Sequence, residues 1–135
     1  MNGYLLDTSI CVFLFRGNPT IEERLNNIGA DKCYITDVVV VELIFGAYYS
    51  DQTEENLRQV EQFIAEIQVI PFSETIHIFA QERAKLWKTG KKIEDFDLLI
   101  GSAAKAKGLT MVTHNVKHFE HIEGLVIEDW IHEQR

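Results

Sequence analysis

Ile93–Lys107, IEDFDLLIGSAAKAK, combines an acidic start with an apolar helical body. The acids Glu94, Asp95 and Asp97 open it, and the small residues Gly101–Ala104 follow, where they allow close helix packing. A carboxylate that is buried loses its hydration, which is costly unless a cation or a proton compensates. The stretch therefore predicts a buried helix whose acids serve a purpose other than stability.

Two other acids, Asp7 and Glu42, stand in similar apolar surroundings. Asp7 follows the apolar stretch Gly3–Leu6, which predicts a strand, and the two hydroxyl residues after it can cap a helix. Glu42 interrupts DVVVVELIFGAYY at Asp37–Tyr49. The valines favour a strand locally, but ELIFGAYY is typical of a helix. We interpret the segment as a buried helix that Asp37 can cap.

The remaining chain alternates between short apolar strands and amphipathic helices. This alternation predicts one α/β domain over residues 1–135, with a parallel sheet covered by helices on both faces. The expected strands are residues 3–6, 33–36, 69–72, 109–112 and 126–127. The expected helices are residues 10–15, 19–28, 37–49, 53–67, 73–89, 93–107 and 117–121.

The composition is that of an ordinary globular protein, with 46% hydrophobic and 25% charged residues. No apolar run reaches the roughly 20 residues of a membrane span. The N-terminus lacks a basic start and a cleavage site, so we expect no signal peptide and a cytoplasmic location. Cys11 and Cys33 stand alone in apolar contexts and are expected to be buried free thiols.

The net charge of −8 argues against nucleic-acid binding, because proteins that bind nucleic acids usually present a basic face. A cluster of acids that holds a metal ion would account for part of this charge. A basic protein partner would make use of the rest.

The predicted topology gathers the acids at one edge of the sheet, where the carboxyl ends of parallel strands bind ligands. Asp7 follows the first strand and Thr113–Asn115 the fourth, while Asp97 and Glu42 come from helices beside them. Neighbouring carboxylates raise one another's pKa unless a cation lies among them. Oxygen ligands favour Mg²⁺ or Mn²⁺, and no clustered Cys/His set suggests zinc.

Each of these residues also has a purely structural explanation. Asp7 could merely cap the first helix, and Asp95 and Asp97 could be a doubled cap for theirs. The histidines are scattered, and each is expected to be a surface or core residue: His77, His114, His118, His121 and His132. Three separated acids together are better evidence for a functional site than any one of them alone.

Four sequence blocks together resemble the PIN-domain ribonucleases of the VapC toxin type. The order of the blocks is specific, although each alone is weak. They are LLDTS (Leu5–Ser9), VELIFGA (Val41–Ala47), DLLIGSAA (Asp97–Ala104), and THNVKHF (Thr113–Phe119) followed by GLVIEDW (Gly124–Trp130). The resemblance implies a PIN-like three-layer α/β/α sandwich with a central, mostly parallel sheet of four to five strands.

The resemblance also implies an activity and partners. The expected protein is an Mg²⁺-dependent endoribonuclease, with Mn²⁺ as a possible substitute, that acts as the toxin of a toxin–antitoxin pair. A VapB-type antitoxin would silence it through an Arg or Lys that reaches the acids. Family members are usually homodimers, and Phe45, Tyr48 and Tyr49 are candidates for an apolar partner surface.

The resemblance assigns roles to the acids. Asp7, Glu42 and Asp97 match the family's three invariant acids and would be both catalytic residues and metal ligands. Water would attack the phosphodiester, with Glu42 orienting the attacking hydroxide, and the products would carry 5′-phosphate and 3′-hydroxyl ends.

Five further residues match supporting positions. Asp95 matches a position that is acidic in some members, and the family's fourth acid falls at Asn115, which leaves a second metal position open. Thr8, Ser9 and Thr113 match small hydroxyl positions.

Lysines around the acidic helix would hold RNA: Lys85, Lys88, Lys91 and Lys92 before it, and Lys105, Lys107 and Lys117 beyond it.

Two alternatives remain open at this stage. One is another Mg²⁺-dependent phosphohydrolase, such as a phosphatase with an aspartyl nucleophile, although that chemistry usually needs a second Asp where Ser9 stands. The other is a catalytically silent PIN-like module that binds RNA or protein. Such a module would commonly lose one of the three acids.

Overall fold

The computed structural model describes residues 3–131 and is built around one five-stranded sheet. The strand order is β3-β2-β1-β4-β5, and every pairing is parallel. The strands are β1 (Tyr4–Leu6), β2 (Cys33–Thr36), β3 (Gln68–Ile70), β4 (Thr110–Val112) and β5 (Ile127–Glu128). The sequence-based prediction of a parallel sheet is confirmed.

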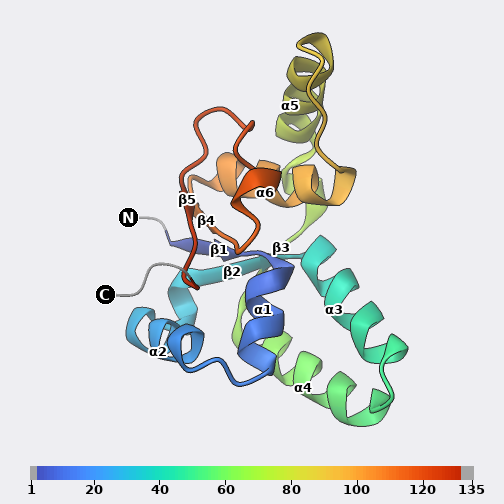
Figure 1. Cartoon of the computed structure of the whole chain (residues 1–135), viewed down its shortest axis with the longest axis vertical. Helices are drawn as coiled ribbons and strands as arrows, with labels where there is room; N and C mark the ends of the chain where they lie inside the picture. The colour runs from blue at the N-terminus through green and yellow to red at the C-terminus, as the bar shows by residue number, and fades with distance from the viewer. Residues whose placement is uncertain (1–2, 132–135) are drawn as a thin grey trace.

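Helices cover both faces of this sheet, as the α/β/α prediction requires. In Figure 1, α5 and α6 lie on one side and α1, α2 and α4 on the other, and α3 packs against both α4 and α6. The α-helices are α1 (Thr8–Phe15), α2 (Pro19–Ile28), α3 (Asp37–Tyr49), α4 (Thr53–Glu66), α5 (Ile76–Lys88) and α6 (Asp95–Lys107). The 3₁₀ turns are η1 (Ala30–Lys32), η2 (Phe72–Glu74) and η3 (Val116–His118).

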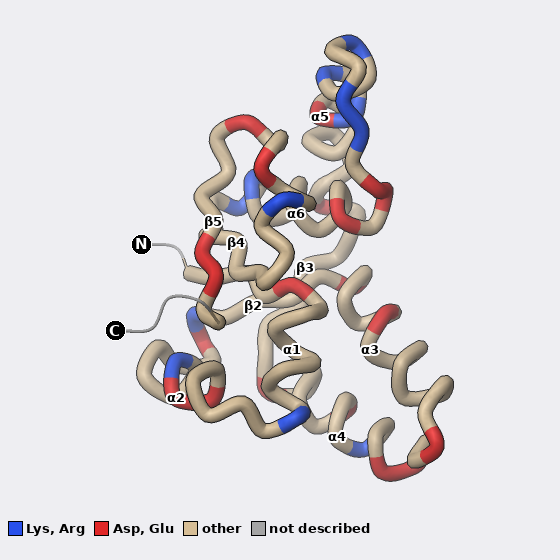
Figure 2. The backbone as a smooth tube through the Cα atoms, in the orientation of Figure 1, with Lys and Arg blue, Asp and Glu red and all other residues tan. Residues whose placement is uncertain are grey.

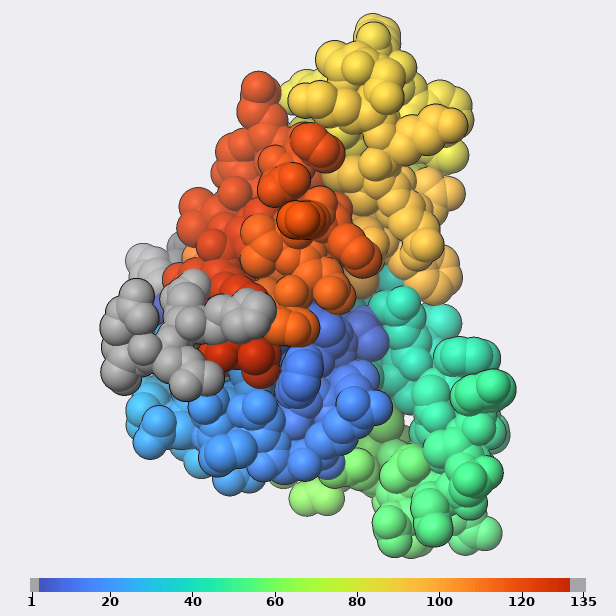
Figure 3. Space-filling view, in the orientation of Figure 1, coloured from blue at the N-terminus to red at the C-terminus, as the bar shows by residue number. Residues whose placement is uncertain are grey.

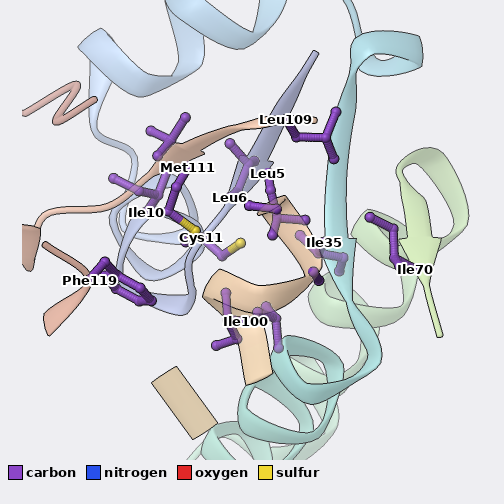
Figure 4. Packing of buried hydrophobic residues seen from close by; sticks show 14 of the residues in the cluster. Leu5, Leu6, Ile10, Cys11, Ile35, Ile70, Ile100, Leu109, Met111 and Phe119 are labelled. Carbon is purple, nitrogen blue, oxygen red and sulfur yellow. The ribbon is translucent and has the colours of Figure 1, made fainter. Parts of the chain in front are cut away.

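The core lies where the central strands meet α6 and α1. Leu5 and Leu6 of β1 are fully buried, and Figure 4 shows them within the hydrophobic cluster. Gly101 of α6 approaches the segment after η3 so closely that a Cβ there would lie 2.4 Å from the Ile122 Cδ1 atom. The small residues of α6 therefore bring its backbone against the core, as expected.

The cap of α3 differs from the expected one, and α1 is capped by Asp7, the stated alternative to the two hydroxyl residues. Asp7 caps α1 by accepting the N–H of Thr8 at 2.8 Å, so the residues predicted to cap are instead the helix's first turn. Thr36 caps α3 through the N–H of Val39, whereas the Asp37 carboxylate accepts the N–H of Phe72 at 2.9 Å. In both places the residue at the strand end is already extended and takes the cap position.

The prediction that 37–49 forms a buried helix is only partly correct. The helix spans these residues, but its core-facing stripe is Val39, Leu43 and Ala47. On its outer side Phe45 and Tyr49 are exposed and their rings stack with centroids 5.8 Å apart. The apolar surface predicted for a partner is therefore present on α3.

Two simpler expectations concern the thiols and the membrane. Cys11 and Cys33 are both buried and free, as predicted. Across residues 3–131, no helix combines the length and the apolar character that crossing a membrane requires.

A buried ion pair joins α5 to α6, the helix that carries Asp97. The Glu82 carboxylate is only 3% exposed and accepts Lys105 Nζ at 2.7 Å, whereas Lys85 lies at 3.4 Å and is more exposed. Removing one partner of a buried pair is strongly destabilising, because the other charge stays buried.

We therefore predict that Lys105→Met lowers the free energy of unfolding by about 2 kcal/mol, since Lys85 can compensate only in part. The matched change Lys85→Met should cost less than about 0.5 kcal/mol, because an exposed pair contributes little. Urea denaturation of both variants measures the difference. Equal losses would show that Lys105 has no special role.

Candidate active site

Three acids from three separate elements meet at the carboxyl end of β1. Asp7 follows β1 directly, Glu42 lies in the second turn of α3, and Asp97 lies in the first turn of α6. Strand β1 is central and α6 is anchored in the core, so the positions are fixed by the fold. The sheet edge predicted from the sequence therefore brings the three acids together.

Asp7 is the most constrained of the three. Its side chain is 4% exposed and accepts three hydrogen bonds: from the Thr8 N–H at 2.8 Å, from Thr113 Oγ1 at 2.8 Å and from Ser9 Oγ at 3.3 Å. Thr113 is itself buried at the end of β4 and accepts the Asn115 N–H. The hydroxyls of Ser9 and Thr113 and the backbone N–H of Thr8 thus hold Asp7 in one orientation.

Glu42 and Asp97 are half-buried, and each has one hydrogen-bond partner. Thr8 Oγ1 donates to Glu42 Oε1, which links α3 to the start of α1. Asp97 Oδ2 lies 3.0 Å from His118 Nδ1 of η3. His118 is a surface residue, as expected, but this contact joins it to the acid cluster. His132 lies outside the described residues.

The electrostatics of the cluster are unfavourable to negative charge. Burial raises the pKa of Asp7 above its ordinary value despite its hydrogen bonds. Burial also raises the pKa of Glu42, and the charges of Asp7, Asp97 and Glu94 add to this effect. For Asp97, burial and the charge of Asp7 raise the pKa, while His118 opposes the shift. The charges of these acids therefore disfavour one another, and His118 opposes the shift for Asp7 and Asp97.

Glu94 is a fourth acid that acts on this cluster. The charge of Glu94 raises the pKa of both Glu42 and Asp97. Asp95 is exposed and its carboxylate instead lies 3.7 Å from the Arg83 guanidinium of α5. The structure thus places the predicted supporting acid, Asp95, in a contact with α5.

Asn115 is exposed after β4, and its described contact to the site is the backbone N–H donated to Thr113. Three of the lysines expected to hold RNA are engaged elsewhere: Lys85 and Lys105 with Glu82, and Lys107 with Glu74. A pocket of about 330 Å³ opens beside Asp97. It is lined by Lys92, Ile93, Glu94, Asp97, Lys117 and His118.

The donor set suits a hard divalent cation. All donors of the three acids are carboxylate oxygens, which Mg²⁺ and Mn²⁺ prefer, and their mutual repulsion would be relieved by a cation. Within residues 3–131, no three Asp, Glu, His or Cys side chains form a ready-made set for a metal ion. Side chains that now bond to Thr8 and His118 would therefore have to turn toward an ion.

Comparison with known proteins gives the family of this chain. The PIN-domain family model matches residues 4–125. The chain is 35% identical over 131 residues to the tRNA(fMet)-specific endonuclease VapC of Shigella flexneri, an alignment that covers 96% of this chain and 99% of that protein.

Two crystal structures share the fold at high similarity. One is the DNA-bound VapBC of Salmonella typhimurium, with a TM-score of 0.89 and 36% identity over 96% of this chain and 99% of that one. The other is VapBC2 of Rickettsia felis bound to a promoter DNA fragment, with a TM-score of 0.87 and 30% identity over 94% and 98%. The resemblance stated from the sequence blocks is confirmed: this chain belongs to the PIN-domain family, among the VapC ribonucleases.

Proposed function

We propose that this protein is a Mg²⁺-dependent endoribonuclease that acts as the toxin of a toxin–antitoxin pair. The observation that carries the proposal is the proximity of Asp7, Glu42 and Asp97. Their negative charges disfavour one another, and a bound cation would relieve this repulsion. Relatives named as endonucleases and ribonucleases match nearly the whole chain, which supports the assignment of RNA as substrate.

Asp7 and Asp97 would hold the metal ion directly. A bound Mg²⁺ activates water and stabilises the charge that develops on the phosphate. Mn²⁺ has the same ligand preference and should substitute. Asn115 stands at the family's fourth acidic position and is neutral, so one ion per site is the simplest arrangement.

The protein's own residues provide orientation and proton transfer. Thr113, Ser9 and the Thr8 N–H fix the Asp7 carboxylate, so that its position is set before substrate binds. Glu42 is less buried, and burial together with neighbouring charges raises its pKa, which favours proton uptake. Glu42 would therefore orient water and accept its proton, leaving products with 5′-phosphate and 3′-hydroxyl ends.

We propose a VapB-type antitoxin and a second copy of this chain as protein partners. A hollow of about 340 Å³ between α1, α3 and α4 has Glu42 in its wall, together with apolar residues such as Leu43 and Val60. This hollow would admit an antitoxin segment whose cation reaches Glu42. The exposed Phe45, Tyr48 and Tyr49 on α3 are the candidates for contact between the two copies.

Incubation of purified protein with total cellular RNA tests this function. We expect discrete fragments with Mg²⁺ or Mn²⁺ and intact RNA with EDTA. End mapping should find 5′-phosphates and 3′-hydroxyls, because water and not the ribose 2′-OH attacks. Fragments ending in 2′,3′-cyclic phosphates would contradict the mechanism. Intact RNA in all reactions, with no metal binding and no effect on growth, would favour a silent binding module.

A further inference from the structure

The strongest basic segment of this acidic chain runs from the projecting end of α5 (Figure 3) to the pocket beside Asp97. It spans residues 83–92, at the end of α5 and in the chain that follows, and it contains no acid. Figure 2 shows these cations gathered on a part of the molecule that projects beyond the sheet. They are Arg83, Lys85, Lys88, Lys91 and Lys92, from a chain total of 13 Lys and Arg.

An exposed aromatic ring lies within this segment. Trp87 is 64% exposed, and the Arg83 guanidinium lies over its ring at 4.7 Å from the centroid. Arg83 also lies 3.7 Å from the Asp95 carboxylate at the start of α6. The Arg83 contact therefore orients one face of the indole, and the exposed remainder of the ring is available to a flat partner. An exposed aromatic ring among cations is the combination on which nucleic-acid bases stack.

The segment continues into the pocket beside Asp97. After α5 the chain turns at Gly90, and the Lys91 N–H bonds to the Leu86 carbonyl at 2.9 Å, which holds the returning chain against the last turn of α5. The next residue, Lys92, lines the pocket with Asp97, and Lys117 lines it as well. Trp87 and the pocket are thus joined by a short, hydrogen-bonded turn.

We propose that this surface, which we name the Trp87 track (Trp87, Lys91, Lys92 and Lys117), holds a single-stranded segment of the RNA substrate. Trp87 would stack on a base flanking the cleaved bond, and the lysines would contact phosphates beside Asp97. Surfaces that bind single strands combine aromatic platforms with cations in this way. The proposal rests on the proposed ribonuclease function and adds which part of the chain grips the RNA. An acidic peptide would use the cations but gain little from a stacking ring.

Tryptophan fluorescence tests the stacking contact directly. The chain has two tryptophans, and the other, Trp130, is fully buried and gives a constant background. A short unstructured oligoribonucleotide, added in EDTA to prevent cleavage, should quench the fluorescence of Trp87. Trp87→Ala should weaken binding by roughly five- to 150-fold, the range for loss of one stacked base, and Trp87→Phe should retain most of the affinity.

The salt dependence of binding tests the lysines. Each phosphate contact to a single strand contributes about 0.7 to the slope of log affinity against log salt, so the Lys92→Ala, Lys117→Ala double variant should reduce that slope by about 1.4. The matched control is Lys32→Ala with Arg58→Ala, which removes the same charge from exposed positions on η1 and α4. The control should leave the slope within about 0.3 of the wild-type value.

The outcomes separate this proposal from the proposed function. Absence of quenching, or track variants that bind and cleave RNA as the control does, would overturn the Trp87 track while leaving the nuclease intact. An acidic peptide that quenches Trp87 where the oligoribonucleotide does not would also overturn it. Quenching and the expected slope change in a protein that cleaves no RNA would support the track and contradict the nuclease.

Discussion

Asp97→Asn should reduce metal-dependent RNA cleavage about a thousandfold, because metal ligands supply several kcal/mol of transition-state stabilisation and each 1.36 kcal/mol is a factor of ten. The amide keeps the size of the side chain and its place in the first turn of α6, so the fold should survive. What it removes is one of the two carboxylates proposed to hold the ion. Initial rates on a single RNA fragment, at saturating Mg²⁺, measure the loss.

Asp95→Asn is the matched control two residues away. Asp95 is exposed and contacts Arg83, so its loss should change the rate by less than about fivefold, the range of an exposed ion pair. If Asp95→Asn were as damaging as Asp97→Asn, the ligand assignment would be wrong. Full activity of Asp97→Asn would exclude that residue from the metal site.

The second large effect concerns the stability of the metal-free protein. Asp7, Glu42 and Asp97 all have a pKa raised in the folded state, first by burial and, for the latter two, also by the charge of Asp7. A raised pKa means that the folded state binds protons more tightly than the unfolded state. In EDTA, the contribution of these acids to the free energy of unfolding should therefore increase as the pH falls from neutrality. The increase should end at about pH 4, the ordinary pKa of a carboxyl group.

The metal ion should replace the proton in this role. At neutral pH, Mg²⁺ at about 100 times its dissociation constant should add about 2.7 kcal/mol to the free energy of unfolding. In EDTA, Asp97→Asn should be more stable than the wild type at pH 7, and the difference should shrink as the pH falls. Thermal denaturation with and without Mg²⁺ measures both effects. The electrostatic account would be contradicted if Mg²⁺ did not change the stability of the wild-type protein and if Asp97→Asn were less stable than the wild type in EDTA.

The three acids could be placed from the sequence because each stands next to a feature with a clear structural meaning. Asp7 ends an apolar strand, and Asp97 precedes a run of small residues that only a closely packed helix would contain. Parallel topology then brings strand ends to one edge of the sheet without any knowledge of side-chain contacts. Glu42 could be placed because a lone acid in an apolar run is rare unless it has a partner.

The errors arise where the outcome depends on the direction of a side chain. Glu94 acts on Glu42 and Asp97 from the non-helical residue before α6, whereas Asp95 opens the helix and its carboxylate lies beside Arg83. Which of these two adjacent acids faces the site depends on where the helix begins, and the sequence alone does not show that boundary. His118 could not be found this way, because its contact with Asp97 depends on the 3₁₀ turn after β4. Likewise, Lys105 is basic in sequence but committed to the buried Glu82.

The most direct test of the central claim is anomalous diffraction from crystals of the wild-type protein soaked in Mn²⁺. We predict a peak bounded by carboxylate oxygens of Asp7 and Asp97, with Glu42 nearby and with the His118 contact to Asp97 loosened. The same soak of Asp97→Asn crystals should show a weaker peak or none. A peak elsewhere on the protein, or no peak in wild-type crystals that retain the fold, would contradict the claim that these acids form a metal-dependent nuclease site.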